Sequence, residues 1–233
     1  MRLAMATIVM AAALTGAATA AAWGQKAPEP RQLPNGKTWS HDADAGRDIM
    51  RTCAACHGEF GGGGGGGVYP RISGMHPDYI AEQLRAFKSR TRENIPMIPY
   101  ANERELPEKD VLDVSYYLAA ITPPKHPPSD QVAMDAFERL TLAKQAVQIS
   151  RQPGDVAAGR TLYNADCMEC HARDGLGRVK KPPLAQQHIP YLRTQITLFL
   201  GGQRQHDDVD ELMRPKSAKD WDNLWAYVST LDD

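Results

Sequence analysis

The chain has 233 residues, of which 42% are hydrophobic, and its formal net charge is −1. This length is sufficient for two small domains that each bury a core. The 27 basic and 28 acidic side chains are dispersed, and no block is rich in lysine and arginine. Composition therefore argues against a nucleic-acid-binding surface, and we expect no nucleic-acid partner.

The N-terminus has the pattern of a secretory signal peptide. Arg2 precedes an apolar stretch over residues 3–14, and small residues follow as far as Ala22. A basic start, a short apolar core and small residues near a cut site are typical of a segment removed after export. We expect a signal peptide over 1–22, an N-terminal extension over 23–41 and no transmembrane segment after cleavage. An uncleaved anchor is the alternative, although the core is shorter than a run of ~20 strongly apolar residues.

The first half of the chain predicts three helices, roughly over 42–53, 77–90 and 107–120. Pro77 and Pro107 lie at or near two of the helix starts, where the missing N–H costs little. The proline-rich segment 122–128 must end the third helix. Residues 129–151 then predict a helix with a partial apolar stripe, so we expect a long, partly helical linker over 122–154.

The second half predicts three more helices, roughly over 155–167, 189–200 and 217–231. Ser217 is a candidate N-cap, with Asp220 at the third helical position. No alternating run is long enough for a strand. We therefore expect an all-α protein.

The second half also repeats the first. Ala-Gly-Arg at 45–47 recurs at 158–160, and Cys-x-x-Cys-His recurs 114 positions after its first occurrence. The segment 79–87 recurs at an offset of 112. The two copies predict duplicated domains over 42–121 and 155–233.

The two Cys-x-x-Cys-His copies contain every cysteine of the chain, namely Cys53, Cys56, Cys167 and Cys170. This pentapeptide is the attachment signature of c-type haem, in which both thiols form thioethers and the adjacent histidine ligates iron. His57 and His171 are those histidines. The sequence therefore predicts two covalently bound haem c groups, and it leaves no thiol for a disulfide or a nucleophile.

Each haem iron needs a second axial ligand. Met97 lies 40 residues beyond His57 and Met213 lies 42 beyond His171, each between the second and third helices of its repeat. A thioether ligand raises the reduction potential, and the matched spacing favours ligation over core filling. His206 lies in the second loop, 35 residues beyond His171, and is an alternative ligand there. Met75 and Met168 are weaker candidates.

Proline carbonyls are expected to orient the two histidines. Pro70 lies 13 residues past His57 and Pro183 lies 12 past His171. A proline offers a carbonyl acceptor on a stiff chain and no competing N–H. Each is therefore a candidate acceptor for an imidazole Nδ1–H.

Several other features have weaker functional interpretations. The seven glycines over 61–67 predict a flexible loop and not a phosphate-binding loop, since no Gly-Lys-Ser/Thr follows. Arg92 and Arg204 are equivalent, and each could pair with a haem propionate or be solvated. Four other histidines have no partner at metal-ligand spacing and are assigned to the surface or to packing: His41, His76, His126 and His188.

The chain resembles a dihaem class I cytochrome c of the cytochrome c4 type. The resemblance rests on Gly-Arg before each haem motif, on Tyr-Pro-Arg-Ile-x-Gly at 69–74, on Tyr-x-x-x-Gln-Leu-x-x-Phe-Lys at 79–88 and on Met97. It implies two tandem class I cytochrome c domains, His/Met ligation and electron transfer in the periplasm. The implied partners are a quinol-oxidising complex or dehydrogenase as donor and a terminal oxidase or reductase as acceptor.

The resemblance implies an electron carrier rather than an enzyme. Two alternatives remain: a cytochrome subunit bound to an oxidoreductase, and an enzyme with one haem that lacks His/Met ligation, such as a peroxidase or an oxidoreductase of inorganic sulfur or nitrogen compounds. Peripheral association with a membrane also stays open.

Overall fold

The computed structural model describes residues 31–32, 38–39, 41–124, 126, 129 and 134–231. The predicted signal peptide over 1–22 lies outside these residues, as does most of the extension over 23–41. In the extension, β1 (Arg31–Gln32) pairs antiparallel with β2 (Thr38–Trp39). The sequence predicted no strand, so this pair of two-residue strands is where the structure differs from the predicted all-α protein. It belongs to a unit separate from residues 41–233, which contain all the described helices.

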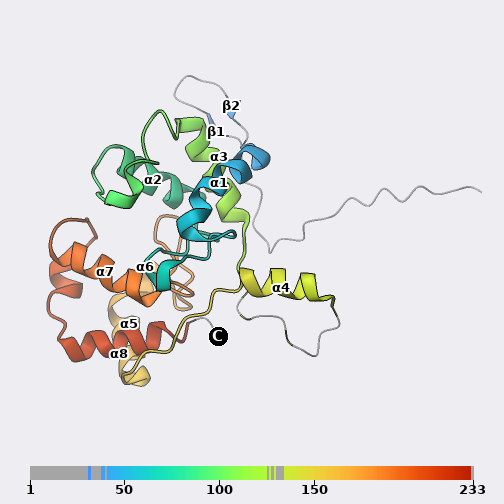
Figure 1. Cartoon of the computed structure of the whole chain (residues 1–233). Helices are drawn as coiled ribbons and strands as arrows, with labels where there is room; N and C mark the ends of the chain where they lie inside the picture. The colour runs from blue at the N-terminus through green and yellow to red at the C-terminus, as the bar shows by residue number, and fades with distance from the viewer. Residues whose placement is uncertain are drawn as a thin grey trace, which may run out of the picture. The chain divides into compact units, whose positions relative to one another are not determined.

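The first domain contains the three predicted helices, labelled in Figure 1: α1 (Ala43–His57), α2 (Pro77–Lys88) and α3 (Glu108–Ala120). Short 3₁₀ turns, η1 (Gly65–Gly67) and η2 (Ile95–Met97), lie in the connections. The carboxylate of Asp42 caps α1 by accepting from the next backbone N–H groups. The helix α1 runs through the first haem motif to His57, further than the sequence predicted.

The second domain repeats this order. Its helices are α5 (Val156–Asp166), α6 (Met168–His171), α7 (Ile189–Leu200) and α8 (Ala218–Val228), with a π-helical turn, η3 (Val209–Met213), before α8. The predicted cap of the last helix is confirmed. The Ser217 hydroxyl accepts from the Asp220 N–H at 3.2 Å, and the Asp220 carboxylate accepts from the Ser217 N–H at 2.9 Å.

The repeated Ala-Gly-Arg has a structural cause in both domains. Helix α1 packs on α3, and α5 packs on α8. A Cβ atom on Gly46 would lie 2.5 Å from the Asp113 carbonyl oxygen, and one on Gly159 would lie 1.9 Å from the Asn223 carbonyl oxygen. Because no side chain fits at either crossing, each copy requires glycine.

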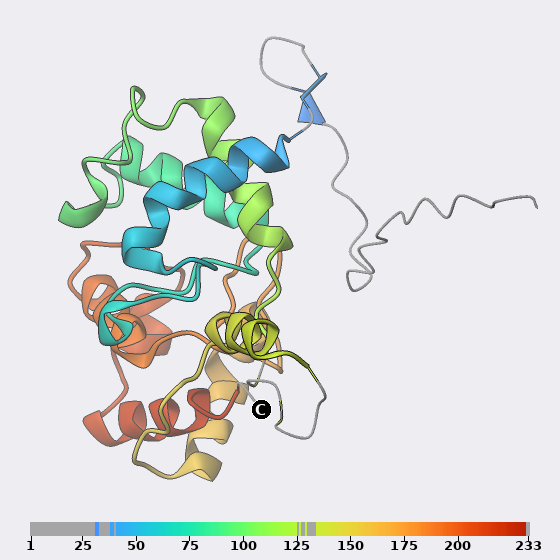
Figure 2. The same cartoon turned by 45° about the vertical axis from the view of Figure 1, so that its right-hand side comes forward.

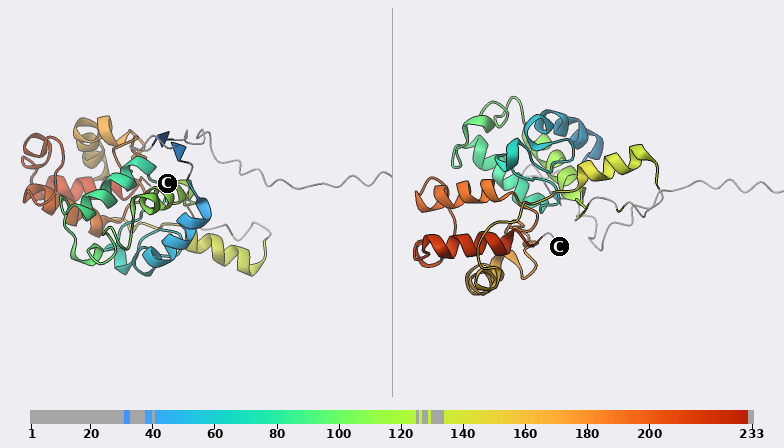
Figure 3. Two further views of the ribbon diagram at one scale, coloured as in Figure 1. Left: turned by 90° about the horizontal axis from the view of Figure 1, so that it is seen from above. Right: turned by 60° about the horizontal axis from the view of Figure 1, so that its bottom comes forward.

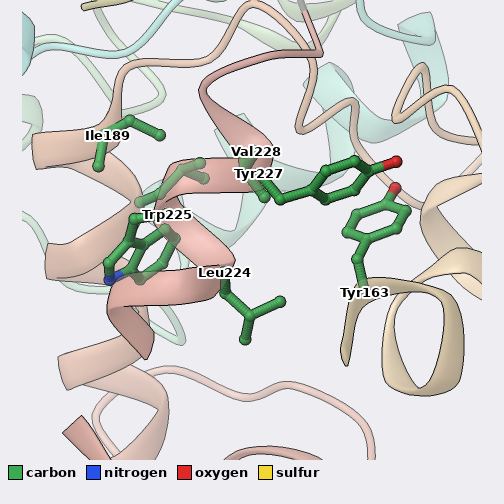
Figure 4. Close-up of a cluster of buried hydrophobic side chains, with 7 residues drawn as sticks. Tyr163, Ile189, Leu224, Trp225, Tyr227 and Val228 are labelled. Carbon is green, nitrogen blue, oxygen red and sulfur yellow. The ribbon is translucent and has the colours of Figure 1, made fainter. Parts of the chain in front are cut away.

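Each domain has its own hydrophobic core. In the first, Met50, Tyr79 and Val114 belong to the buried cluster between α1, α2 and α3. In the second, the Tyr163 and Tyr227 rings lie 5.2 Å apart, and Figure 4 shows them side by side, on α5 and α8. These separate cores agree with two duplicated domains.

The linker contains one helix, α4 (Ala136–Gln145). The helix predicted over 129–151 is therefore too long at both ends: the described residues 129, 134 and 135 and residues 146–151 are not helical, and residues 130–133 lie outside the described part. Helix α4 buries none of its residues, and Phe137 is 79% exposed. It lies at the edge of the helical part in both panels of Figure 3. Helix α4 ends at Gln145. The chain then continues without helix, and Val147 is buried.

The two domains contact each other within residues 41–233. The side-chain amide of Gln187 clamps the backbone of Arg71: its Oε1 accepts from the Arg71 N–H at 2.9 Å, and its Nε2 donates to the Arg71 carbonyl at 2.9 Å. The glycine-rich loop with η1 also contacts α7, and both views in Figures 1 and 2 place them next to each other. None of the described helices has the length and apolar character needed to cross a membrane.

Candidate functional site

The first haem motif lies on the last two turns of α1. Residues three and four apart share a helix face, so Cys53, Cys56 and His57 lie on one side of α1. Both thiols are half-buried and the His57 side chain is 8% exposed. The structure therefore brings together the three groups that the pentapeptide predicts for one haem.

The His57 imidazole has the predicted hydrogen bond. Its Nδ1 lies 2.9 Å from the Pro70 carbonyl oxygen, to which it donates as Nδ1–H. This contact leaves Nε2 unprotonated and available to a metal. Burial lowers the His57 pKa, which keeps the ring neutral at physiological pH.

The second haem motif has a different backbone conformation from the first, but its histidine is buried in the same way. Cys167 separates α5 from α6, with φ −119°, and Cys170 and His171 follow in α6. His171 is 8% exposed, and burial lowers its pKa to about 4. This buried neutral imidazole is the counterpart of His57.

The predicted acceptor Pro183 is wrong, and the acceptor is Pro182. The His171 Nδ1 lies 2.8 Å from the Pro182 carbonyl oxygen. The backbone register explains the difference. The N–H groups of Ile72 and Ser73 donate to the Gly61 carbonyl, and those of Leu184 and Ala185 donate to the Gly175 carbonyl. Leu184 is therefore the counterpart of Ile72, which makes Pro182 the counterpart of Pro70.

The four cysteines form no disulfide and are free thiols in this structure. Burial raises the pKa of Cys53, and it raises the pKa of Cys167 to about 11. Among the described residues, no three His, Cys, Asp or Glu side chains gather as a separate metal site.

The two candidate methionine ligands lie in the predicted loops. Met97 ends η2 and is half-buried, whereas Met213 ends η3 and is 8% exposed. Neither belongs to the hydrophobic clusters of its domain. Met75 belongs to the first cluster and Met168 packs against the second, so both act in packing.

The alternative ligand His206 lies opposite His171. Their ring centroids are 6.3 Å apart, with 22° between the ring planes. In the first domain, by contrast, the loop over 89–107 contains no histidine. The other histidines have packing or surface positions: His41 stacks on Tyr116 at 4.9 Å, and His126 is exposed.

One buried and two half-buried arginines provide positive charge. Arg71 is 3% exposed, burial lowers its pKa to about 10, and its Nε has no hydrogen-bond partner among the described residues. In the described part of the chain, Arg92 and Arg204 bond to Gln and Tyr side chains and form no ion pair with a carboxylate. Burial is the main cause that lowers the pKa of Arg92. Buried or half-buried cations without anionic partners among the described residues suit the carboxylates of haem.

These observations test whether haem fits, and the residues do fit. Each domain has two half-buried thiols, a buried histidine with a fixed tautomer, and a loop methionine. Sequence analysis gave Arg71 no role, although its place directly after Pro70 was a usable signal.

The glycine-rich segment is not the flexible loop that the sequence predicted. The Gly63 N–H donates to the His57 carbonyl at 2.8 Å, and the His188 Nε2 lies 2.8 Å from the Gly62 carbonyl. A Cβ atom on Gly63, whose φ is +99°, would lie 2.4 Å from the His188 Nε2. Glycine is required here because the second domain approaches the backbone closely.

Comparison with known proteins finds one family and a consistent set of relatives. The sequence profile of the family described as Cytochrome c matches residues 43–122 and 156–232. Cytochrome c4 of Thiocapsa roseopersicina is 33% identical over 188 residues, which are 76% of this chain and 83% of that protein. The thiosulfate dehydrogenase electron acceptor of Thiomonas intermedia is 29% identical over 157 residues, 67% of this chain and 66% of that protein. The crystal structure of cytochrome c4 from Pseudomonas stutzeri aligns with a TM-score of 0.59 and 23% identity, over 82% of this chain and 98% of that one.

Proposed function

Because the chain belongs to the cytochrome c family, we propose that it is a dihaem electron carrier of the cytochrome c4 type. The observation that supports this most is the duplicated site. Each domain presents a pair of thiols beside a buried histidine whose Nδ1 is bonded to a proline carbonyl. Cys53 and Cys56 would hold one haem c, and Cys167 and Cys170 the other.

A bound haem supplies reversible one-electron chemistry at its iron. The protein would orient His57 and His171 toward the iron through Pro70 and Pro182, and it would shield both rings from water. Met97 completes the first site in this proposal. Met213, the ligand predicted from spacing, and His206 compete for the second.

Positive charge would hold the haem carboxylates. The candidates are the Nε of Arg71, which has no hydrogen-bond partner among the described residues, and the half-buried guanidinium groups of Arg92 and Arg204. A guanidinium binds a carboxylate through parallel N–H groups, and burial strengthens the attraction. Buried positive charge near a haem also favours its reduced form, which has one positive charge fewer.

We place the mature protein in the periplasm, because the signal-like N-terminus and covalent haem attachment both fit export. Its partners would be redox proteins, with a quinol-oxidising complex or a dehydrogenase as donor and a terminal oxidase or reductase as acceptor. The relative named as a thiosulfate dehydrogenase electron acceptor supports a dehydrogenase donor. It also supports a second candidate function, a cytochrome subunit of a sulfur-compound oxidoreductase.

Titration of the purified holoprotein with a stoichiometric reductant tests the carrier function. A carrier takes up two electrons per chain, returns both to an added oxidant, and does not turn over thiosulfate or peroxide by itself. Cys56→Ala and Cys170→Ala should each remove one haem and leave one electron per chain. Sustained turnover of thiosulfate or peroxide by the isolated wild type would overturn the carrier function in favour of an enzyme.

A further inference from the structure

We infer that the loop over 172–181, directly after the second haem motif, is a docking surface for an acidic electron-transfer protein. This inference deepens the proposed function, on which it rests. Five side chains of the loop are basic or apolar and exposed: Arg173, Leu176, Arg178, Val179 and Lys180. The two apolar ones, Leu176 and Val179, are 57% and 53% exposed. Apolar side chains surrounded by basic ones fit a partner whose contact face is acidic with an apolar centre.

The 172–181 loop lies beside the second haem site. The Arg178 Nε donates to the carbonyl of Glu169, which is part of the haem motif, at 2.9 Å. The Gly177 N–H donates to the His171 carbonyl at 3.0 Å. These hydrogen bonds hold the loop against the motif. A partner bound to the loop therefore lies next to the haem that Cys170 would hold, as electron transfer requires.

Positive charge dominates the 172–181 loop. Its sequence contains four basic side chains and one acidic side chain, Asp174. Among the described residues, Lys180 lies 4.0 Å from the Glu82 carboxylate and Lys181 pairs with Asp207, but neither arginine of the loop forms an ion pair. Asp207 begins an acidic segment over 207–211, so the excess of positive charge is confined to the loop. An acidic partner would be attracted to this loop and not to the domain as a whole.

The equivalent loop of the first domain does not offer such a surface. Over 58–70 it contains no lysine or arginine. It also contacts the other domain, because the Gly62 carbonyl lies 2.8 Å from the His188 Nε2 and Gly67 is buried. One copy of the duplicated loop thus forms part of the domain interface, whereas the other copy is exposed. An acidic partner would consequently exchange electrons with the second haem.

Electron uptake from an acidic protein tests this inference. Fully reduced flavodoxin, a small acidic electron-transfer protein, is mixed with the oxidised holoprotein, and stopped-flow absorbance follows haem reduction at several salt concentrations. The net charge of the chain is −1, so its overall charge gives no attraction to an acidic partner. We expect the second-order rate constant nevertheless to fall as salt rises from about 10 mM to about 200 mM, because salt screens the local attraction of the loop.

A pair of charge-reversal variants separates the loop from the overall charge. Arg173→Glu/Arg178→Glu should lower the rate constant about 3- to 10-fold at about 10 mM salt and abolish its decrease with salt. The matched control, Arg47→Glu/Arg51→Glu, changes the net charge equally on α1, where Asp44 and Asp48 pair with the two arginines. The control variant should change the rate constant by less than about twofold.

The apolar part of the loop has a separate test. Leu176→Ser/Val179→Ser should raise the flavodoxin concentration that gives half the maximal reduction rate, because less apolar surface is buried in the complex. The decrease of the rate constant with salt should persist in this variant, since its charges are those of the wild type. An unchanged half-saturating concentration would contradict an apolar contact at this loop.

The inference is overturned if the wild-type rate constant rises with salt, or if the two charge-reversal variants have equal rate constants. Arg173→Gln/Arg178→Gln serves if the glutamate variant fails to fold, and it should give a smaller loss in the same direction. Titration with dithionite distinguishes this failure from failure of the proposed function. A protein that takes up two electrons reversibly, without the effects above, remains a carrier but does not dock acidic partners through this loop.

Discussion

Arg92 and Arg204 make the same contact in opposite directions between the two domains. The Arg92 Nη2 donates to the Tyr191 hydroxyl at 3.1 Å, and the Arg204 Nη2 donates to the Tyr79 hydroxyl at 3.0 Å. Both guanidinium groups also share two acceptors, the side-chain carbonyls of Gln83 and Gln195. The repeat found in the sequence therefore produces a nearly symmetric interdomain network.

This sharing predicts that the two arginines are energetically coupled. Arg92→Ala and Arg204→Ala should each lower the free energy of unfolding by about 1–3 kcal/mol, because buried acceptors lose their donors. The double variant should differ from the sum by more than about 0.5 kcal/mol. Guanidinium unfolding of the holoprotein, followed by far-UV circular dichroism, measures both quantities. Arg47, which pairs with Asp44 on the surface, is the control: Arg47→Ala should be additive with Arg204→Ala.

Substitution of the glycines over 61–67 by alanine should lower the free energy of unfolding by an amount that depends on the position. Gly63→Ala should destabilise the protein by about 2–5 kcal/mol, since it combines an unfavourable positive φ with a clash against His188. Gly66 also has a positive φ, but nothing lies within 4 Å of its added Cβ. Gly66→Ala should therefore cost only about 1–2 kcal/mol. Equal midpoints for the two variants in denaturant unfolding would show that the loop is not held against the second domain.

The capping box of α8 predicts a pH-dependent effect. Ser217→Ala should cost about 1 kcal/mol at pH 7. Hydrogen bonds from the Ser217 side chain and backbone lower the Asp220 pKa below its ordinary 3.8. A lowered carboxyl pKa adds stability above the unfolded value and loses it as pH falls through the folded value. The difference between wild type and Ser217→Ala should shrink below about pH 4, as unfolding curves at several pH values can test. In an Asp220→Asn background, that pH dependence should be absent.

Substitution of Met97 should change the midpoint potential of one haem only. Met97→Leu removes a thioether from the first site and should lower the midpoint potential of that haem, because methionine ligation raises the potential. The potential of the second haem should change much less. Spectroelectrochemical titration resolves the two values. If both potentials stay at wild-type values, Met97 is not a ligand.

The sequence predicted most of the helical fold because its signals are local. Pro77 is the first residue of α2, Ser217 caps α8, and glycine recurs at both helix crossings. The tandem cytochrome c fold is confirmed. The linker helix was predicted too long, because its partial apolar stripe did not show where the helix begins and ends; Phe137, on that stripe, is 79% exposed.

Errors at the site have two causes, which are a change in loop length and contact between segments far apart in the chain. Pro182 replaces Pro183 because the loop after His171 is two residues shorter than its counterpart, and the bonds to Gly175 set the register. The glycine loop is ordered by His188, 126 positions away from Gly62. Arg71 is held by Ala185 and Gln187 of the other domain. No local pattern contains the interdomain partners of Gly62 and Arg71.

The intact mass of the mature, purified protein tests the central claim most directly. It should equal the mass of a chain cleaved near Ala22 with two haems attached through Cys53, Cys56, Cys167 and Cys170. Cys170→Ala should lose one haem by the same measurement. A wild-type mass with no haem, or with only one, would contradict the assignment of this protein as a dihaem cytochrome.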